Sequence, residues 1–283
     1  MTDIRRGSIM VFKAAGIQMS CSEDVGRNLR KASEMAEYAL ESGARVIVFQ
    51  QLFHLPWFPA ETDAGQFSLA ETEDGPAISA MRKIARDAGA VIVCPIFERE
   101  GDVRYNTAFV IDADGSIAGR YRKVHVPDIP LWREKFYFTP GDLGFPVIPT
   151  RYARIGVQLC WDLFFPEGCR ALALKGAELI VAPTAAAFSS ALKWERMATS
   201  AAIANGVYVF RVNRVGGPEN QRFYGKSFMV NPFGEIAIDP TGKMDAVVFA
   251  EVDLDQIGVA RQLWNFLGDR RPEHYKDLMG GTL

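Results

Sequence analysis

Strand signals and helix signals alternate along the first two thirds of this chain, and several strands then follow in succession. Apolar runs typical of strands cover residues 11 to 18, 45 to 50, 90 to 97, 153 to 160, 177 to 183 and 207 to 213. Helical signals mark 25 to 40, 75 to 88, 166 to 175 and 191 to 205. The "DADG" turn joins two more strands, a hairpin is expected over 227 to 239, and 245 to 253 reads as a last strand. This order predicts a layered α/β fold.

The length and the charge balance exclude several classes of protein. No linker, low-complexity stretch or repeat divides the 283 residues, so we expect one domain over 1–283. The formal charge of -2 lacks the basic excess that nucleic acid binding requires. No apolar run is long enough to cross a membrane, and "SIMVF" (8 to 12) is interpreted as the start of a strand and not as a signal peptide. The four cysteines lack C-x-x-C spacing, which favours reduced thiols in a cytoplasmic protein.

Elimination leaves cysteine chemistry. The serine hydrolase, P-loop and dinucleotide motifs G-x-S-x-G, G-x-x-x-x-G-K-[ST] and G-x-G-x-x-G are all missing. His54, His125 and His274 are too scattered to predict a zinc site, so we expect neither a metal nor an organic cofactor.

Cys160 and Lys123 are the strongest candidates for a catalytic pair. Cys160 closes the strand "RIGVQLC" where the chain turns toward a helix, and helix N–H groups there favour a thiolate. A small buried hydrophobe is the alternative for any single cysteine, and it is the preferred interpretation of Cys21 and Cys94. Lys123 ends an alternating strand and offers a cation, although taken alone it is more typical of a solvated surface charge.

Three segments then form a recognisable set. The segments "VFQQLF" (48 to 53), "YRKVHVPD" (121 to 128) and "IGVQLCWDLFFPEGCRALALKGAELI" (155 to 180) resemble the three signature regions of the nitrilase or carbon-nitrogen hydrolase superfamily. The "REKFYFTPGD" and "CWDLFFPE" segments are most similar to the N-carbamoylputrescine amidase and β-ureidopropionase-like branches. The resemblance extends over most of the chain.

The resemblance implies a four-layer α-β-β-α sandwich with a Glu, a Lys and a Cys meeting at strand ends. In that scheme the Glu is the general base, the Cys attacks the substrate carbon to form a thioester, and the Lys stabilises the tetrahedral intermediate. Lys123 and Cys160 fall on the family positions. Glu134 falls on a second glutamate that helps to hold the lysine and the substrate.

Gln51 stands where the family has its catalytic glutamate. Glutamine keeps the shape but cannot accept a proton, so we expect severely impaired hydrolysis. Three explanations remain open: an engineered Glu-to-Gln substitution, a natural relative that binds without hydrolysing, or Glu134 acting as the base instead.

Residues around these positions are candidates for substrate binding. The aromatic segments 52 to 59 and 129 to 136 supply side chains for a pocket wall, with ordinary core or dimer packing as the alternative. Asp162, Asp128 and Glu167 are candidates to receive a cationic amine, with helix capping as the alternative. The expected substrate-binding set is Phe53, Trp132, Trp161, Asp162, Phe164, Pro183 and Thr184.

The sequence therefore predicts a cysteine-dependent hydrolase of amides or N-carbamoyl amines that lacks its base. A nitrilase acting on nitriles is one alternative, and a noncatalytic binding or assembly protein on the same scaffold is another. The tail 261 to 283 mixes large apolar residues with charges, which predicts packing on a second subunit in a homodimer or a multiple of it.

Overall fold

The computed structural model describes residues 11–238 and 242–279, and their strands form two large sheets. The first has the order β13-β1-β2-β3-β4-β5, from Ala246–Asp253, Val11–Gln18, Ala44–Phe49, Val91–Glu100, Val103–Ile111 and Ile117–Arg122. The second has the order β12-β9-β8-β7-β6, from Phe228–Val230, Tyr208–Asn213, Leu179–Thr184, Arg154–Val157 and Val147–Pro149. The short strands β10 (Val215–Gly216) and β11 (Phe223–Tyr224) pair separately.

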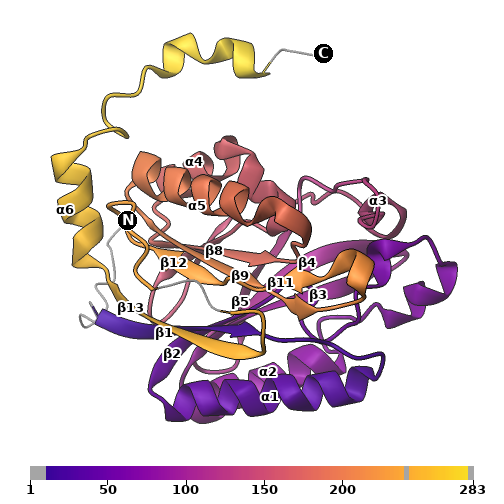
Figure 1. The fold of residues 1–283 in the computed structure, drawn as a ribbon. Helices are drawn as coiled ribbons and strands as arrows, with labels where there is room; N and C mark the ends of the chain where they lie inside the picture. The colour runs from indigo at the N-terminus through magenta and orange to yellow at the C-terminus, as the bar shows by residue number, and fades with distance from the viewer. Residues whose placement is uncertain (1–10, 239–241, 280–283) are drawn as a thin grey trace.

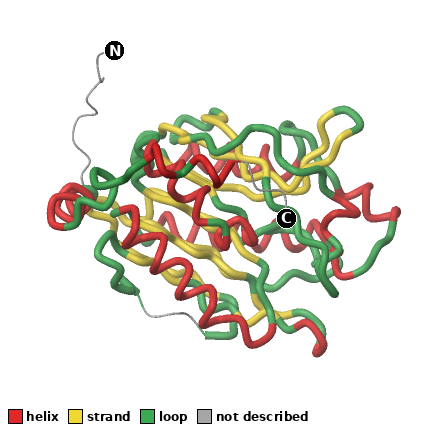
Figure 2. The backbone as a smooth tube through the Cα atoms, turned by 90° about the horizontal axis from the view of Figure 1, so that it is seen from above, coloured by secondary structure: helices red, strands yellow, loops and turns green. Residues whose placement is uncertain are grey.

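Helices cover the outer face of each sheet. The helices α1 (Val25–Glu41) and α2 (Pro76–Ala88) lie on the first sheet, whereas α4 (Pro166–Leu174) and α5 (Ala191–Asn205) lie on the second (Figure 1). Seen from above, helices again lie over the strands (Figure 2). Two short helices, α3 (Glu134–Tyr137) and α6 (Asp255–Leu263), lie outside these layers. The α-β-β-α sandwich is confirmed.

Side-chain alternation explains the four layers. In β2, Val46 and Val48 belong to the core between the sheets, whereas Ile47 and Phe49 belong to the core beneath α1 and α2. Successive strand residues point to opposite faces, so a strand that is apolar throughout needs cover on both sides. The sheets approach closely at Gly16, where a Cβ would lie 2.8 Å from the Phe210 ring. The core therefore has three apolar layers between four layers of structure.

Two sequence expectations need correction in the last third. The hairpin predicted over 227 to 239 is reduced to β12 and a single bridge from Val230 to Ile236, and residue 239 lies outside the described residues. The strand predicted over 153 to 160 ends at Val157, so Cys160 lies beyond it in a 3-10 turn. Residues 8–10 of the "SIMVF" run also lie outside the described residues, which begin at β1.

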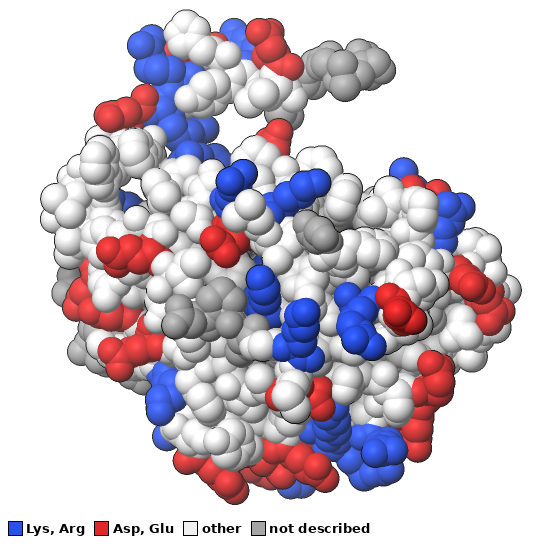
Figure 3. All heavy atoms as spheres, viewed as in Figure 1, with Lys and Arg blue, Asp and Glu red and all other residues white. Residues whose placement is uncertain are grey.

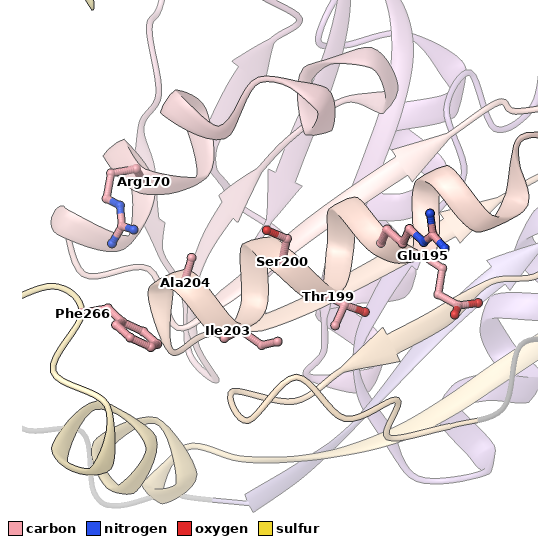
Figure 4. Close-up of a pocket in the computed structure, with 8 residues that line it drawn as sticks. Arg170, Glu195, Thr199, Ser200, Ile203, Ala204 and Phe266 are labelled. Atoms are coloured by element: carbon pink, nitrogen blue, oxygen red, sulfur yellow. The ribbon is translucent and has the colours of Figure 1, made fainter. Parts of the chain in front are cut away.

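The segment after α6 extends away from the body of the molecule (Figure 1). Its large apolar side chains are exposed, including Trp264 at 64% and Leu278 at 70%. A hollow separates it from the body (Figure 3), and Phe266 faces Ile203 and Ala204 at the end of α5 (Figure 4). None of the helices within 11–238 and 242–279 combines the length and apolar character that crossing a membrane requires.

Candidate active site

Strand ends from both sheets bring the predicted catalytic residues together. Gln51 follows β2, Lys123 follows β5, and Cys160 follows β7, while Glu134 begins the short helix α3. All four side chains are buried. The Lys123 Nζ atom lies 2.6 Å from Glu134 Oε2, and Gln51 Nε2 donates to Glu134 Oε1 at 3.4 Å. Glu134 is therefore the centre of the polar cluster, with an amide on one oxygen and an ammonium on the other.

The two adjacent glutamines at the end of β2 make different contacts. Gln50 links the ends of β1 and β2, because its Oε1 accepts from the Met19 N–H at 2.8 Å. Gln51 points to the Lys123–Glu134 pair, and its Oε1 is buried with no hydrogen-bond partner among the described residues. Buried amide oxygens are normally paired, so this oxygen is available to a group that enters the site.

Backbone strain accompanies the two key positions. Cys160 has φ 50° and Leu52, directly after Gln51, has φ 51°. Such left-handed conformations cost a side-chain-bearing residue about 1–3 kcal/mol and are typical of functional sites. In the β7-to-α4 connection, this strain places the Cys160 thiol at the cavity described below.

Asp162 holds the strained turn in place. Its carboxylate accepts from the Leu159 and His125 N–H groups at 3.2 and 2.8 Å and from the Tyr121 hydroxyl at 2.7 Å. Tyr121 and His125 flank Lys123, so one buried carboxylate connects the Cys160 turn to the end of β5. Asp162, which the sequence offers as a candidate receptor for an amine, is fully buried in this network.

Burial dominates the acid–base behaviour of the thiol. It raises the pKa of Cys160 above the range of an ordinary cysteine, although Lys123 and Arg211 lower it in part. The net direction is opposite to what the strand-to-helix position alone suggests. Burial would lower the pKa of Lys123, yet Glu134 and Cys160 raise it above its usual value, so Lys123 is a cation. The resting thiol therefore needs a base to become a thiolate.

Cys160 opens onto a cavity of about 390 Å³. Its wall is mainly aromatic and aliphatic, and it is lined by Pro127, Ile129, Trp132, Cys160, Trp161, Phe164, Ala185, Ala186, Ala187, Phe188, Ser190, Lys193 and Trp194. The predicted residues Trp132, Trp161 and Phe164 are among them. This volume is within the range typical of small-molecule sites.

The remaining predicted binding residues do not line this cavity. Phe53 is buried in the core beneath α1 and α2, and Pro183 and Thr184 are buried in β8. Asp128 is ion-paired with Arg133 at 3.3 Å, and Glu167 lines a different cavity on the outer side of α4 and α5. Three of the predicted aromatic residues therefore line the cavity, and the carboxylates of Asp128 and Glu167 do not.

Sequence reasoning missed several site residues. Asn106 donates to Glu134 Oε2 at 3.4 Å from the middle of β4. The connection Ala185–Ala187 and the first turn of α5 form one side of the cavity. The sequence offered one signal for this connection, because "PTAAAF" (183 to 188) stands at the end of a predicted strand. The ends of neighbouring parallel strands lie at the same edge of a sheet, which here is the edge that carries Cys160. Among the described residues no three His, Cys, Asp or Glu side chains gather as a metal would require.

Alkylation tests the assignment of the nucleophile. Burial raises the pKa of all four thiols, that of Cys169 to about 12, but Cys160 is the one of the four that lines the cavity described above. We expect iodoacetamide to modify Cys160 first, with a rate that keeps rising into alkaline pH as the thiolate forms. Peptide mass spectrometry measures this, with Cys160→Ala as control. Faster labelling of Cys21 or Cys94, with Cys160 unmodified, would contradict it.

Comparison with known proteins gives an independent result. The family model described as Carbon-nitrogen hydrolase matches residues 13–262. The N-carbamoylputrescine amidase of Arabidopsis thaliana is 39% identical over 294 residues, covering 98% of this chain and 97% of the relative. A carbon-nitrogen hydrolase from Helicobacter pylori G27 has a TM-score of 0.92 at 32% identity, covering 96% of this chain and 100% of that one.

A mutant amidase is also similar in structure. It is a glutamate-to-glutamine mutant of the amidase from Nesterenkonia sp. AN1, with the acetamide moiety of fluoroacetamide added covalently at the active-site cysteine. It has a TM-score of 0.81 at 27% identity, covering 98% of this chain and 99% of that one. With a family match over most of the chain, a relative of similar length and the predicted sandwich all in agreement, the chain belongs to the carbon-nitrogen hydrolase family.

Proposed function

We propose that this chain is a cysteine-dependent hydrolase of amides or N-carbamoyl amines whose general base is missing because residue 51 is glutamine. The observation that carries the proposal is the contact of Gln51 with Glu134, which also pairs with Lys123, next to a cavity lined by Cys160. An amide at this position can donate to Glu134 but cannot remove a proton from a thiol.

The reaction follows from these groups. In the reaction with a base present, such as a glutamate at position 51, the base takes the thiol proton as Cys160 Sγ attacks the carbonyl carbon, and the Lys123 ammonium, together with the Trp161 N–H, stabilises the oxyanion. The C–N bond then breaks, the base returns the proton to the nitrogen, which leaves as amine or ammonia, and a thioester remains on Cys160. Water gives a proton to the base and attacks the thioester carbon, which releases the acid, and the proton passes to sulfur to regenerate the thiol. Both halves need a proton acceptor, which Gln51 cannot be.

Glu134 is a positioning residue in this proposal. One oxygen lies 2.6 Å from Lys123 Nζ and the other accepts from Gln51, so both of its oxygens are already engaged. This arrangement supports a carboxylate that orients the lysine and weighs against the alternative that Glu134 is the base.

Two origins of Gln51 fit the same geometry. An engineered substitution would explain why Lys123, Glu134 and Cys160 are all retained, whereas a natural binding protein would have kept them without using them. Sequencing the gene from its source distinguishes these. We also propose, from the reduced cysteines, a cytoplasmic location.

Substrate class is tested by ammonia release. The Gln51→Glu variant is assayed on nitriles, primary amides and N-carbamoyl amines. Preferred release from amides or N-carbamoyl amines supports the proposal, and preferred release from nitriles favours the nitrilase alternative. The similar amidase with a glutamate-to-glutamine change carries the acetamide moiety of fluoroacetamide on its cysteine, which supports a thiol that still reacts when glutamine replaces the glutamate.

We further propose that the tail 261–283 and the outer side of α5 bind a second copy of the chain. Leu263 is 66% exposed and Trp264 is 64% exposed, while a cavity of about 360 Å³ between α4, α5 and the tail is lined by apolar residues such as Met197 and Leu278. An exposed apolar patch of this kind is typical of an interface.

Light scattering checks the assembly. At micromolar concentration we expect a mass of at least twice the 31.4 kDa of one chain. The variant Trp264→Ser with Phe266→Ser should shift the mass toward the monomer, because it removes apolar area from the tail. Tyr38→Ser on α1, which is 57% exposed on the opposite helical layer, is the matched control. A monomeric mass for the unmodified chain contradicts the proposal.

A further inference from the structure

The cavity at Cys160 is lined mainly by apolar residues, with one cation among them. Of its lining residues, only Lys193 is formally charged, and apart from Ser190 and Cys160 the others are apolar or aromatic. No carboxylate lies among the described lining residues. The wall around a substrate is thus apolar with one cation.

Lys193 has no role in holding the fold. It lies in the first turn of α5, is exposed, and forms no ion pair or side-chain hydrogen bond within the described part of the chain. An exposed lysine with its full set of donors is free to bind an anion. The start of α5 also places unpaired backbone N–H groups on this side, which adds a partial positive charge.

A second cation lies behind the wall. Arg211 on β9 is buried, and its guanidinium stacks over the ring of Trp194, a lining residue, at 5.1 Å. Its partners are the Lys226 carbonyl and the Tyr224 hydroxyl, and its Nε is buried with no partner among the described residues. Since no carboxylate in the part of the chain that the structure describes pairs with Arg211, its charge adds to that of Lys193.

The carboxylates that a cationic substrate would need are engaged elsewhere. Asp162 is buried beneath the Cys160 turn, where it accepts from Tyr121 and His125. Asp128 is paired with Arg133, and Glu167 lines the cavity on the outer side of α4 and α5. An ammonium group entering the Cys160 cavity would lose water without gaining a counter-charge, which is unfavourable.

We propose that Lys193 is a specificity-determining residue and that the substrate is an amide or N-carbamoyl amine with an apolar body and a carboxylate at its far end. The proposal rests on the proposed function, because the reacting bond must lie at Cys160 for the far end to reach Lys193. The apolar wall contacts the body of the substrate, and the cation at the rim selects the charge of its end.

Three probes of similar length test the charge preference: the N-carbamoyl derivatives of γ-aminobutyrate, n-pentylamine and putrescine, which end in an anion, a methyl group and a cation. In the Gln51→Glu background we expect kcat/KM to fall in that order. Lys193→Glu should lower kcat/KM for the anionic probe about tenfold and raise it for the cationic probe about as much, as for a partly solvated charge pair. Lys193→Met should lower kcat/KM for the anionic probe and have a smaller effect on kcat/KM for the neutral probe.

A binding measurement separates failure of this inference from failure of the proposed function. Calorimetry on Cys160→Ala reports the dissociation constants of the same probes without turnover, and these should follow the same order. The control Lys83→Glu makes the same change in net charge on α2, in the other helical layer. If no probe is hydrolysed but the anion binds best through Lys193, the preference of the cavity for a carboxylate stands and the hydrolase proposal fails. If the cationic or neutral probe is preferred, or Lys193→Glu changes nothing, the inference is overturned.

Discussion

The variant Gln51→Glu should hydrolyse amides or N-carbamoyl amines about two to four powers of ten faster than the chain as it stands, because general base assistance is worth about 10²–10⁴ in rate. The substitution changes an amide for a carboxylate of almost the same volume, so the fold should tolerate it. Burial raises the pKa of the Cys160 thiol, so the thiol keeps its proton when no base is present. A carboxylate at position 51 can remove that proton. Steady-state ammonia release measures the gain.

The pH profile of this variant should reflect the new carboxyl group. Gln51 Nε2 lies 3.4 Å from Glu134 Oε1, so a glutamate there would have a like charge beside it and the Lys123 cation close by. The like charge raises the pKa of the new carboxyl group and the cation lowers it. We expect activity to rise across mildly acidic pH, as the new carboxyl group becomes ionised.

Two controls define the result. Gln51→Glu combined with Cys160→Ala should be inactive. The unmodified chain mixed with substrate should instead keep a bound ligand or a slowly decaying thioester, visible as added mass on Cys160. If Gln51→Glu folds normally but hydrolyses nothing in a broad panel, the chain is a binding protein on this scaffold.

Breaking the buried Lys123–Glu134 pair should have the largest effect on stability. Removing one partner leaves the other charge buried and uncompensated, which costs about 3–5 kcal/mol. We therefore expect Glu134→Gln and Lys123→Met each to lower the free energy of unfolding by about that amount. The double variant Lys123→Met with Glu134→Leu should regain most of the loss while remaining inactive in the Gln51→Glu background, because the oxyanion has lost its cation.

An exposed pair of equal length provides the control. Lys83 Nζ lies 2.6 Å from Asp87 Oδ2, the same distance as in the buried pair, but the Lys83 side chain is 73% exposed. Lys83→Met should cost at most about 0.5 kcal/mol, since solvent screens the pair. Urea unfolding measures all four variants. Equal losses at the two pairs would show that burial is not the cause.

The same pair predicts a dependence of stability on alkaline pH. The pKa of Lys123 is raised in the folded protein, so its contribution is complete below the unfolded pKa and is lost as pH rises through the folded pKa. Above the ordinary range of lysine, the unmodified chain should therefore lose stability faster than the Lys123→Met with Glu134→Leu variant.

The sequence by itself determined most of the elements and the positions of the candidate catalytic residues. Apolar runs and helical spacing are local information, and they located β1, α1, β2 and α5 closely. The residues Gln51, Lys123 and Cys160 follow strands, and their motifs identified the family before any geometry was known. That residue 51 cannot accept a proton was also readable, because an amide side chain has no titratable group whatever its surroundings.

Only the tertiary structure decided which groups meet. β13 returns to pair with β1, more than two hundred residues away in sequence, although it follows strands of the other sheet. Asp162 accepts hydrogen bonds beneath the Cys160 turn and Lys193 lines the cavity, because these contacts depend on what long-range packing places opposite each side chain. The raised pKa of Cys160 has the same origin: helix N–H groups are a local feature, but burial is set by the whole fold, and here burial is the larger effect.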